Sequence, residues 1–230
     1  MLKNEKIVLA NLKANFAPQA ALRWLDALLT ELPEAPSGLR VLLALPDMTL
    51  AEASGKIRGR KGIALAAQTV SPYPQGSYTG STPAAWLRGL VTHTLAGHRE
   101  RRGRFRETVQ DVANIAREAL AEEITPIICV DGDNFAQQLG ALTREEQEPV
   151  LWAFTPRVEM PLAGPDFETI KESLARIRRQ GNDRPVLYGG GVDVDNARTI
   201  WAGANCGGLL VASACREPER FAALVRGLGA

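Results

Sequence analysis

The chain has 230 residues, of which 45% are hydrophobic and 23% are charged, and its formal net charge is +1. These values are ordinary for a globular domain with a sizeable core, and they give no argument for a nucleic-acid or strongly acidic partner. No apolar run approaches the roughly 20 residues of a membrane span, and Asn11 and Lys13 interrupt the N-terminal apolar stretch, which does not resemble a cleavable signal. The three cysteines lack metal-ligand spacing, so we expect a cytoplasmic protein with reduced thiols and no metal site.

Eight short apolar runs are predicted strands, at residues 6–12, 40–45, 63–68, 90–97, 126–130, 150–154, 186–190 and 208–212. Between several of them lie segments with helical spacing of apolar residues, at 20–32, 107–122, 167–179 and 217–228. The strands are apolar almost throughout, which favours a parallel sheet covered by helices. The alternation therefore predicts one α/β domain over residues 1–230, either a closed (β/α)₈ barrel or a doubly wound open sheet. Periodicity does not separate the two.

Functional residues of parallel α/β folds lie where the strands end. The residues read at these ends are Asn11, Lys13, Gln68, His98, Glu100, Cys129, Thr155, Gly189, Gly190, Gly191, Ala212 and Ser213.

Lys13 and His98 are the strand-end residues with the clearest chemistry. A lysine placed there could aim its charge into a barrel mouth, although a solvated loop lysine has the same local sequence. A histidine there could polarise a carbonyl or move a proton, or simply bond a nearby backbone group. The adjacent charges from Glu100 to Arg102 could equally be a surface salt-bridge group of little energetic value.

The three consecutive glycines at 189–191 follow a predicted strand. Glycines allow unusual dihedral angles and close backbone approach, so their N–H groups could cradle a phosphate. The last strand ends at Ala212 and Ser213, shortly before the predicted helix at 217–228. Phosphate sites in β/α barrels often use the loops after the last two strands, although a glycine run can also be a simple turn.

Taken in order, the segments NLKANF, AAQTVSPYPQGSYTG, AGHRERR, TPIICV, YGGGVDVDNA and GLLVASACREPERF resemble the triosephosphate isomerase family over nearly the whole chain. The resemblance implies the closed barrel rather than the open sheet. It also implies a cofactor-free interconversion of dihydroxyacetone phosphate and glyceraldehyde 3-phosphate, in which a carboxylate base moves a proton between adjacent carbons.

The same resemblance implies roles for individual residues. Lys13 would stabilise developing charge, His98 would polarise the carbonyl, Glu100 would support the site and Asn11 would position it. Backbone amides near Gly190, Gly191, Ala212 and Ser213 would hold the phosphate. The segment from Gln68 to Gly80 resembles the loop that inserts into a partner subunit, with Thr79 near the partner's site, which implies a homodimer; the alternative is a surface loop on a monomer.

The resemblance fails at the base. The family motif resembling AYEPVW ends its sixth strand with a glutamate, and the counterpart here is Ala-Phe-Thr-Pro, with Thr155 at that position. Glu148 precedes the only strand candidate of this region and would lie at the wrong end of the barrel. Glu159, four residues past Thr155, could approach the site only if the following loop folds inward.

Two further positions depart from the family pattern. Arg99 replaces the small serine of the GHSERR signature beside the histidine, and the lid tip is replaced by RVEMPLAGP, whose Pro161 and Pro165 restrict a hinge. Losing a positioned base typically costs about 10²–10⁴ in rate, so we expect weak or absent isomerase activity. The alternatives are a barrel that binds a phosphorylated metabolite or serves regulation or assembly, and a different enzyme using His98 and Lys13.

Overall fold

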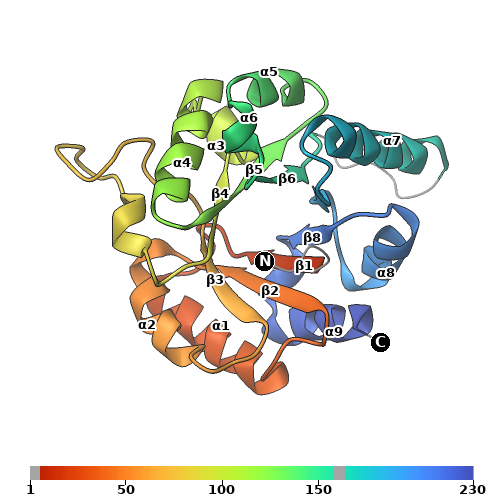
Figure 1. Ribbon diagram of the computed structural model, residues 1–230. Helices are drawn as coiled ribbons and strands as arrows, with labels where there is room; N and C mark the ends of the chain where they lie inside the picture. The colour runs from red at the N-terminus through yellow and green to blue at the C-terminus, as the bar shows by residue number, and fades with distance from the viewer. Residues whose placement is uncertain (1–5, 158–163, 230) are drawn as a thin grey trace.

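The computed structural model describes residues 6–157 and 164–229, and it shows a closed barrel of eight parallel strands in the order of the sequence. This is the predicted (β/α)₈ fold (Figure 1). The strands are β1 (Lys6–Asn11), β2 (Leu39–Ala44), β3 (Ile63–Ala67), β4 (His93–Ala96), β5 (Thr125–Val130), β6 (Leu151–Phe154), β7 (Leu187–Tyr188) and β8 (Gly208–Val211). Each lies inside the apolar run that predicts it or within one residue of it.

Helices surround the barrel on its outside (Figure 1). The α-helices are α1 (Pro18–Glu31), α2 (Leu50–Lys56), α3 (Arg99–Arg104), α4 (Val109–Ala121), α5 (Phe135–Gly140), α6 (Arg144–Gln147), α7 (Gly164–Gln180), α8 (Val194–Gly203) and α9 (Pro218–Leu228). The 3₁₀ turns are η1 (Asp47–Thr49), η2 (Ala84–Leu87) and η3 (Ala214–Arg216). In the described part of the chain, no helix is long and apolar enough to cross a membrane.

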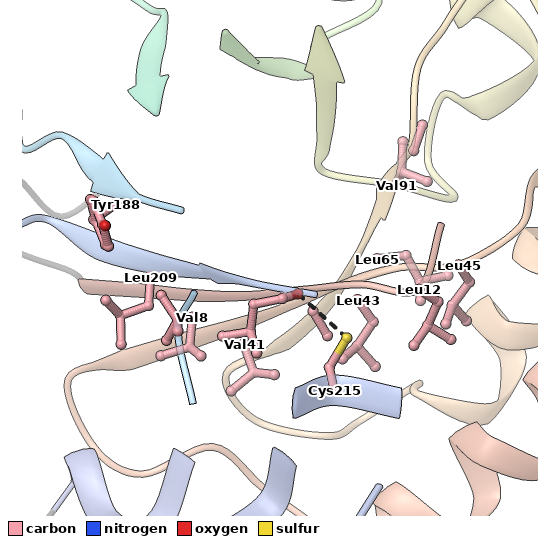
Figure 2. Packing of buried hydrophobic residues seen from close by; sticks show 14 of the residues in the cluster. Val8, Leu12, Val41, Leu43, Leu45, Leu65, Val91, Tyr188, Leu209 and Cys215 are labelled. Atoms are coloured by element: carbon pink, nitrogen blue, oxygen red, sulfur yellow. Dashed lines mark hydrogen bonds between the residues drawn. The ribbon is translucent and has the colours of Figure 1, made fainter. Parts of the chain in front are cut away.

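Alternation along each strand divides the core into two layers. One set of apolar residues fills the barrel interior, for example Leu9, Leu95 and Ala153. The opposite set packs between the sheet and the helices. Figure 2 shows this outer set near Cys215, where side chains such as Val8 and Val41 gather from neighbouring strands. Because successive strand residues face opposite sides, two buried layers require strands that are apolar throughout.

The same alternation brings specific residues to the barrel mouth. Side chains two residues apart on a strand face the same side of the sheet. The position two residues after the last interior residue of a strand therefore also faces inward, at the carboxyl end of the barrel. Asn11 follows Leu9 in this way, and Thr155 follows Ala153. The corresponding positions after β3, β7 and β8 are Gln68, Gly189 and Ala212.

His93 is a buried histidine at the start of β4, with only 3% of its surface exposed. Its Nδ1 lies 2.8 Å from the Thr92 hydroxyl. Burial, assisted by the nearby charge of Arg40, lowers the pKa of His93 to about 4. The folded protein therefore holds this ring neutral, whereas an unfolded chain protonates it near pH 6.5.

We predict that His93 makes the fold sensitive to acid. Because the folded pKa lies below the unfolded one, the stabilisation is complete above pH 6.5 and is lost as the pH falls towards 4. The loss between pH 7 and 4.5 is about 2 kcal/mol. Urea unfolding of the wild type and of His93→Gln, which cannot titrate, should therefore diverge by about this amount over that range. Identical pH dependence in the two proteins would contradict the prediction.

Candidate active site

Lys13 is held in a strained conformation just beyond β1. Its φ is 52°, in the left-handed region that residues other than glycine rarely adopt. The Lys13 N–H donates to Asn11 Oδ1 at 3.0 Å, and Gln68 Nε2 donates to the Lys13 carbonyl at 2.8 Å. Such a backbone costs about 1–3 kcal/mol and persists only where its surroundings enforce it. Asn11 and Gln68 therefore fix the lysine, a role for Gln68 that sequence reasoning missed.

The Lys13 ammonium forms an ion pair across the barrel mouth. Its Nζ donates to Glu100 Oε1 at 2.6 Å, and Glu100 Oε2 lies 3.6 Å from His98 Nδ1. Burial alone would raise the pKa of Glu100, but the hydrogen bond and charge of Lys13 outweigh burial and lower it. The structure thus brings together the three residues expected to share one site, and Lys13 is not a solvated loop lysine.

His98 caps the N-terminus of α3, and its Nδ1 accepts a hydrogen bond from the Glu100 N–H at 3.3 Å. An accepting Nδ1 leaves the ring proton of neutral imidazole on Nε2. The side chain is 7% exposed, and burial lowers the pKa of His98 to about 4 despite the opposing effect of Glu100. His98 is therefore a neutral ring with an Nε2 donor, and the backbone bond proposed as an alternative accompanies this role rather than replacing it.

The arginines after Glu100 belong to a structured network rather than a loose surface cluster. Arg102 Nε donates to the Gly97 carbonyl at 2.7 Å, and its Nη2 donates to Gln138 Oε1 at 2.8 Å. Arg101 pairs with Glu107, a buried carboxylate that also accepts from the Gly97 N–H. Gly97 has a φ of 68°, and a Cβ there would collide with the Arg102 guanidinium. Arg101 and Arg102 thus tie this part-exposed helix to neighbouring segments.

A pocket opens at the barrel mouth between these residues and the ends of the last two strands. Its lining residues are Lys13, His98, Arg99, Gly189, Gly191, Val192, Leu210, Ala212 and Ser213. Gly191 has a φ of 57°, which explains a glycine at this turn. Gly190 lies outside this lining, and a Cβ there would lie 2.7 Å from Tyr188 Oη and 3.0 Å from Pro156 Cγ. Of the glycine run, Gly189 and Gly191 therefore reach the pocket.

Ala212 and Ser213 reach the pocket from the end of β8, where Ser213 precedes the turn η3. The Trp24 indole donates to the Cys215 carbonyl at 2.9 Å and fixes that turn to α1. Ala212 and Ser213 are not among the described residues with left-handed φ, so neither requires glycine. Their amides are suited to the expected phosphate role without a conformational penalty.

Thr155 lies directly after β6, at the inward-facing position of the mouth. It is 3% exposed, and its hydroxyl lies 3.5 Å from the Val130 carbonyl. Its methyl group packs against Gly189, since a Cβ on that glycine would lie 3.1 Å from Thr155 Cγ2. The Thr155 side chain thus fills space inside the barrel mouth, and its hydroxyl faces the neighbouring strand β5.

Glu148 does not change this assignment. Glu148 follows α6 and precedes β6, which places it at the amino end of the strand and away from the mouth. Glu159 and Pro161 lie outside the described residues. The predicted polar stretch before Glu148 is the helix α6, capped by a reciprocal bond pair between Thr143 and Glu146.

Pro156 and Arg157, which follow β6, are held by residues that follow β4 and β5. Arg99 Nη1 donates to the carbonyl of Pro156 at 3.2 Å. Arg157 pairs with Asp131 at 2.9 Å. Burial would raise the pKa of Asp131, but backbone hydrogen bonds and Arg157 lower it. These contacts were not predictable locally, because each joins segments that are distant in the sequence.

The described residues at the barrel mouth offer neither a metal-binding group nor a reactive thiol. Among the described residues, no group of three or more His, Cys, Asp or Glu side chains could hold a metal ion. Cys129, a strand-end candidate, is fully buried, and burial raises the pKa of its thiol to about 12. A thiol of that pKa is not a nucleophile near neutral pH.

Comparison with known proteins gives the family. The family model described as triosephosphate isomerase matches residues 6–151 and 166–228. This chain belongs to the triosephosphate isomerase family. The triosephosphate isomerases of Delftia acidovorans and Paracidovorax citrulli are 33% and 32% identical to it, covering 96% and 97% of this chain and 98% of each relative. The crystal structure of triosephosphate isomerase from Bartonella henselae has the same fold, with a TM-score of 0.81 over 97% of this chain and 99% of that chain at 23% identity.

The family match is interrupted at one place. The unmatched residues 152–165 contain Thr155 and the segment that follows it. In contrast, the residues that build the ion pair and the glycine end of the pocket all lie in matched regions. The stretch that the family model leaves unmatched thus covers most of β6 and the residues that follow it, up to residue 165.

We predict that neither histidine of this chain titrates near neutral pH. The chain has only His93 and His98, and both have pKa values of about 4. Because the charge of Glu100 raises the pKa of His98, Glu100→Gln should shift the midpoint of His98 lower and leave His93 unchanged. Ring ¹⁵N NMR titration, assigned with His93→Gln, measures both midpoints. A midpoint near 6.5 for His98 would contradict the neutral-ring assignment.

Proposed function

We propose that this protein binds a small phosphorylated metabolite at the barrel mouth and has weak or no triosephosphate isomerase activity. The glycine turn at Gly191 and the backbone at Ala212 and Ser213 would hold the phosphate, and Lys13 and His98 would face the rest of the ligand. A cytoplasmic location belongs to the same proposal, and three buried cysteines without disulfides support it.

The observation that carries the proposal is Thr155. A threonine hydroxyl does not accept a proton usefully near neutral pH without a stronger base beside it, and this hydroxyl lies against a main-chain carbonyl. The pocket lining contains no carboxylate among the described residues. Moving a proton between adjacent carbons needs a base within hydrogen-bond reach, and the described residues of the pocket lining do not supply one.

The rest of the site retains its polarising groups. The neutral His98 ring can donate from Nε2 to a carbonyl oxygen, and the Lys13 ammonium can stabilise negative charge developing there. Both can also bind a ligand without turning it over. Loss of a positioned base alone corresponds to about 10²–10⁴ in rate, so a residual isomerase would be slow.

A homodimer is also part of the proposal. The loop between β3 and η2 extends away from the barrel (Figure 1), and Thr79 in this loop is exposed. Tyr73 and Tyr78 stack on each other in this loop, with ring centroids 4.6 Å apart, and both are more than 40% exposed. Met48 and Trp86, in the turns η1 and η2, are exposed as well. Such exposed apolar side chains support an interface on this side of the barrel.

We predict that Thr155→Glu restores isomerase activity. In an assay coupled to product formation from glyceraldehyde 3-phosphate, the wild type should lie near background. The glutamate variant should exceed it by about 10-fold or more, because it supplies the missing base beside an organised site. Thr155→Gln is the matched control, since it has the same length and cannot act as a base.

Arg99 could neutralise a new glutamate by pairing with it, so the double variant Thr155→Glu, Arg99→Ser separates the two effects. Turnover by the wild type well above background would contradict the proposed loss of activity. Failure of both glutamate variants would contradict the view that the remaining site is organised for the family reaction.

We predict a dimer in solution. Static light scattering should give twice the 24.8 kDa mass of one chain. The paired substitution Tyr73→Ser, Tyr78→Ser should shift the mass towards the monomer, because it removes exposed aromatic area from the loop. Trp201→Phe, outside the loop, is the control. A monomer at all concentrations of the wild type would overturn this part of the proposal.

A further inference from the structure

Gln138 is a buried polar side chain to which the proposed function gives no role. It lies in the short helix α5 and is 0% exposed. Its Oε1 accepts a hydrogen bond from Arg102 Nη2 at 2.8 Å, and its Nε2 donates to the Val109 carbonyl at 3.2 Å. A buried amide is costly unless it is hydrogen-bonded, and these two contacts bind both of its ends.

The two partners of Gln138 also fix which way its amide points. A guanidinium carries only donors, and a main-chain carbonyl only accepts. Turning the amide over would therefore set donor against donor and acceptor against acceptor. The Gln138 side chain thus presents an oxygen, and not an N–H, to Arg102.

Arg102 transmits this contact to the residue before His98. Its Nε donates to the Gly97 carbonyl at 2.7 Å, and its Nη2 also donates to the Cys129 carbonyl at 3.3 Å. In the described part of the chain no carboxylate forms an ion pair with Arg102, so three neutral oxygens hold its charge. Of these three, only the oxygen of Gln138 belongs to a side chain.

Gly97 sets the position from which the His98 side chain leaves the backbone. The Gly97 N–H donates to Glu107 Oε2 at 2.9 Å, while its carbonyl accepts from Arg102. The peptide that joins Gly97 to His98 is therefore held directly before the histidine that caps α3. His98 Nδ1 accepts from the Glu100 N–H at 3.3 Å, a long hydrogen bond that a small displacement would break.

We propose that Gln138 is a positioning residue for His98. Acting through Arg102 and the Gly97 carbonyl, it keeps His98 Nδ1 within reach of the Glu100 N–H, so that the ring proton stays on Nε2. His98 lines the pocket, and an Nε2 donor is what the proposed function requires there. The role of His98 towards a ligand rests on the proposed function, whereas its tautomer is measured without any ligand.

The test is ring ¹⁵N NMR of His98 in the full chain at pH 7, where the ring is neutral. In the wild type the shifts should report the Nε2–H tautomer almost alone. Gln138→Met keeps the length of the side chain and removes its oxygen, so Arg102 loses that acceptor. The ratio of the Nδ1–H to the Nε2–H tautomer should then rise by about fivefold, as expected when one ordinary hydrogen bond no longer biases it.

Two further variants separate positioning from a loss of stability. Gln138→Glu keeps an oxygen for Arg102 and should keep the wild-type tautomer. Gln147→Met is the matched control, because Gln147 Nε2 also makes two hydrogen bonds, to the carbonyls of Leu139 and Leu142 at 3.0 Å each, from the next helix α6. This control should lower the melting temperature without changing the tautomer.

The activity that Thr155→Glu is predicted to restore gives a second readout. Adding Gln138→Met to Thr155→Glu should lower kcat by about tenfold, with a smaller effect on KM, because a misplaced His98 donor no longer meets the reacting carbonyl. Adding Gln147→Met to Thr155→Glu should leave kcat within about twofold.

An unchanged tautomer in a folded Gln138→Met protein would overturn the inference, and so would a Gln138→Glu protein that behaves like Gln138→Met. If Gln138→Met does not fold, Arg102→Lys replaces it: lysine keeps the charge but loses the fork that reaches Gln138, and a wild-type tautomer there overturns the inference equally. If Thr155→Glu is inactive while the tautomer responds as expected, the view of an organised site in the proposed function fails and the positioning role of Gln138 stands.

Discussion

Closure of eight parallel strands into a barrel is the constraint on which the rest of this structure depends. A closed sheet has one inside and one outside, and both are buried, so each strand must be apolar on both faces. Beyond the buried layers, the next inward-facing positions of the strands lie together at one mouth of the barrel. This geometry brings together residues that are far apart in the sequence. Those at the inward-facing positions of the mouth include Asn11, Gln68, Thr155 and Gly189.

The electrostatics of the mouth follow from burial and one ion pair. His98 is neutral chiefly because it is buried, and its capping bond to the Glu100 amide fixes which nitrogen carries the proton. Glu100 stays ionised because Lys13 outweighs the cost of burying it. The strained backbone of Lys13 is enforced by Asn11 and Gln68. The polar groups expected at the mouth thus form one bonded assembly, and Thr155 places a hydroxyl at the position where the resemblance implies a carboxylate base.

Much of the fold could be predicted from the sequence, because unbroken apolar runs are the direct mark of doubly buried strands. The long helices could be predicted as well, since α1 and α4 each bury one periodic face. The short helix α3 could not, because none of its residues is buried and it has no apolar period to detect. The bonds from Gln68 to Lys13 and from Arg99 to Pro156 join residues more than fifty positions apart, and no local pattern encodes them. At Thr155 the residue type is visible in the sequence, but the direction of its hydroxyl depends on the carbonyl of the neighbouring strand.

The packing of Arg102 against Gly97 limits the residues that these two positions can hold. The guanidinium of Arg102 occupies the place where a side chain on Gly97 would lie, and it binds the Gly97 carbonyl from there. From the same position it reaches the Cys129 carbonyl in β5 and Gln138 in α5, which joins the segment after β4 to both elements. A larger residue at 97 would displace the arginine, and a shorter residue at 102 would leave an unfilled space beside three polar groups. Because Gly97 also has a φ of 68°, a larger residue there would be strained even beside a shorter residue at 102, so the pair resists replacement at both positions.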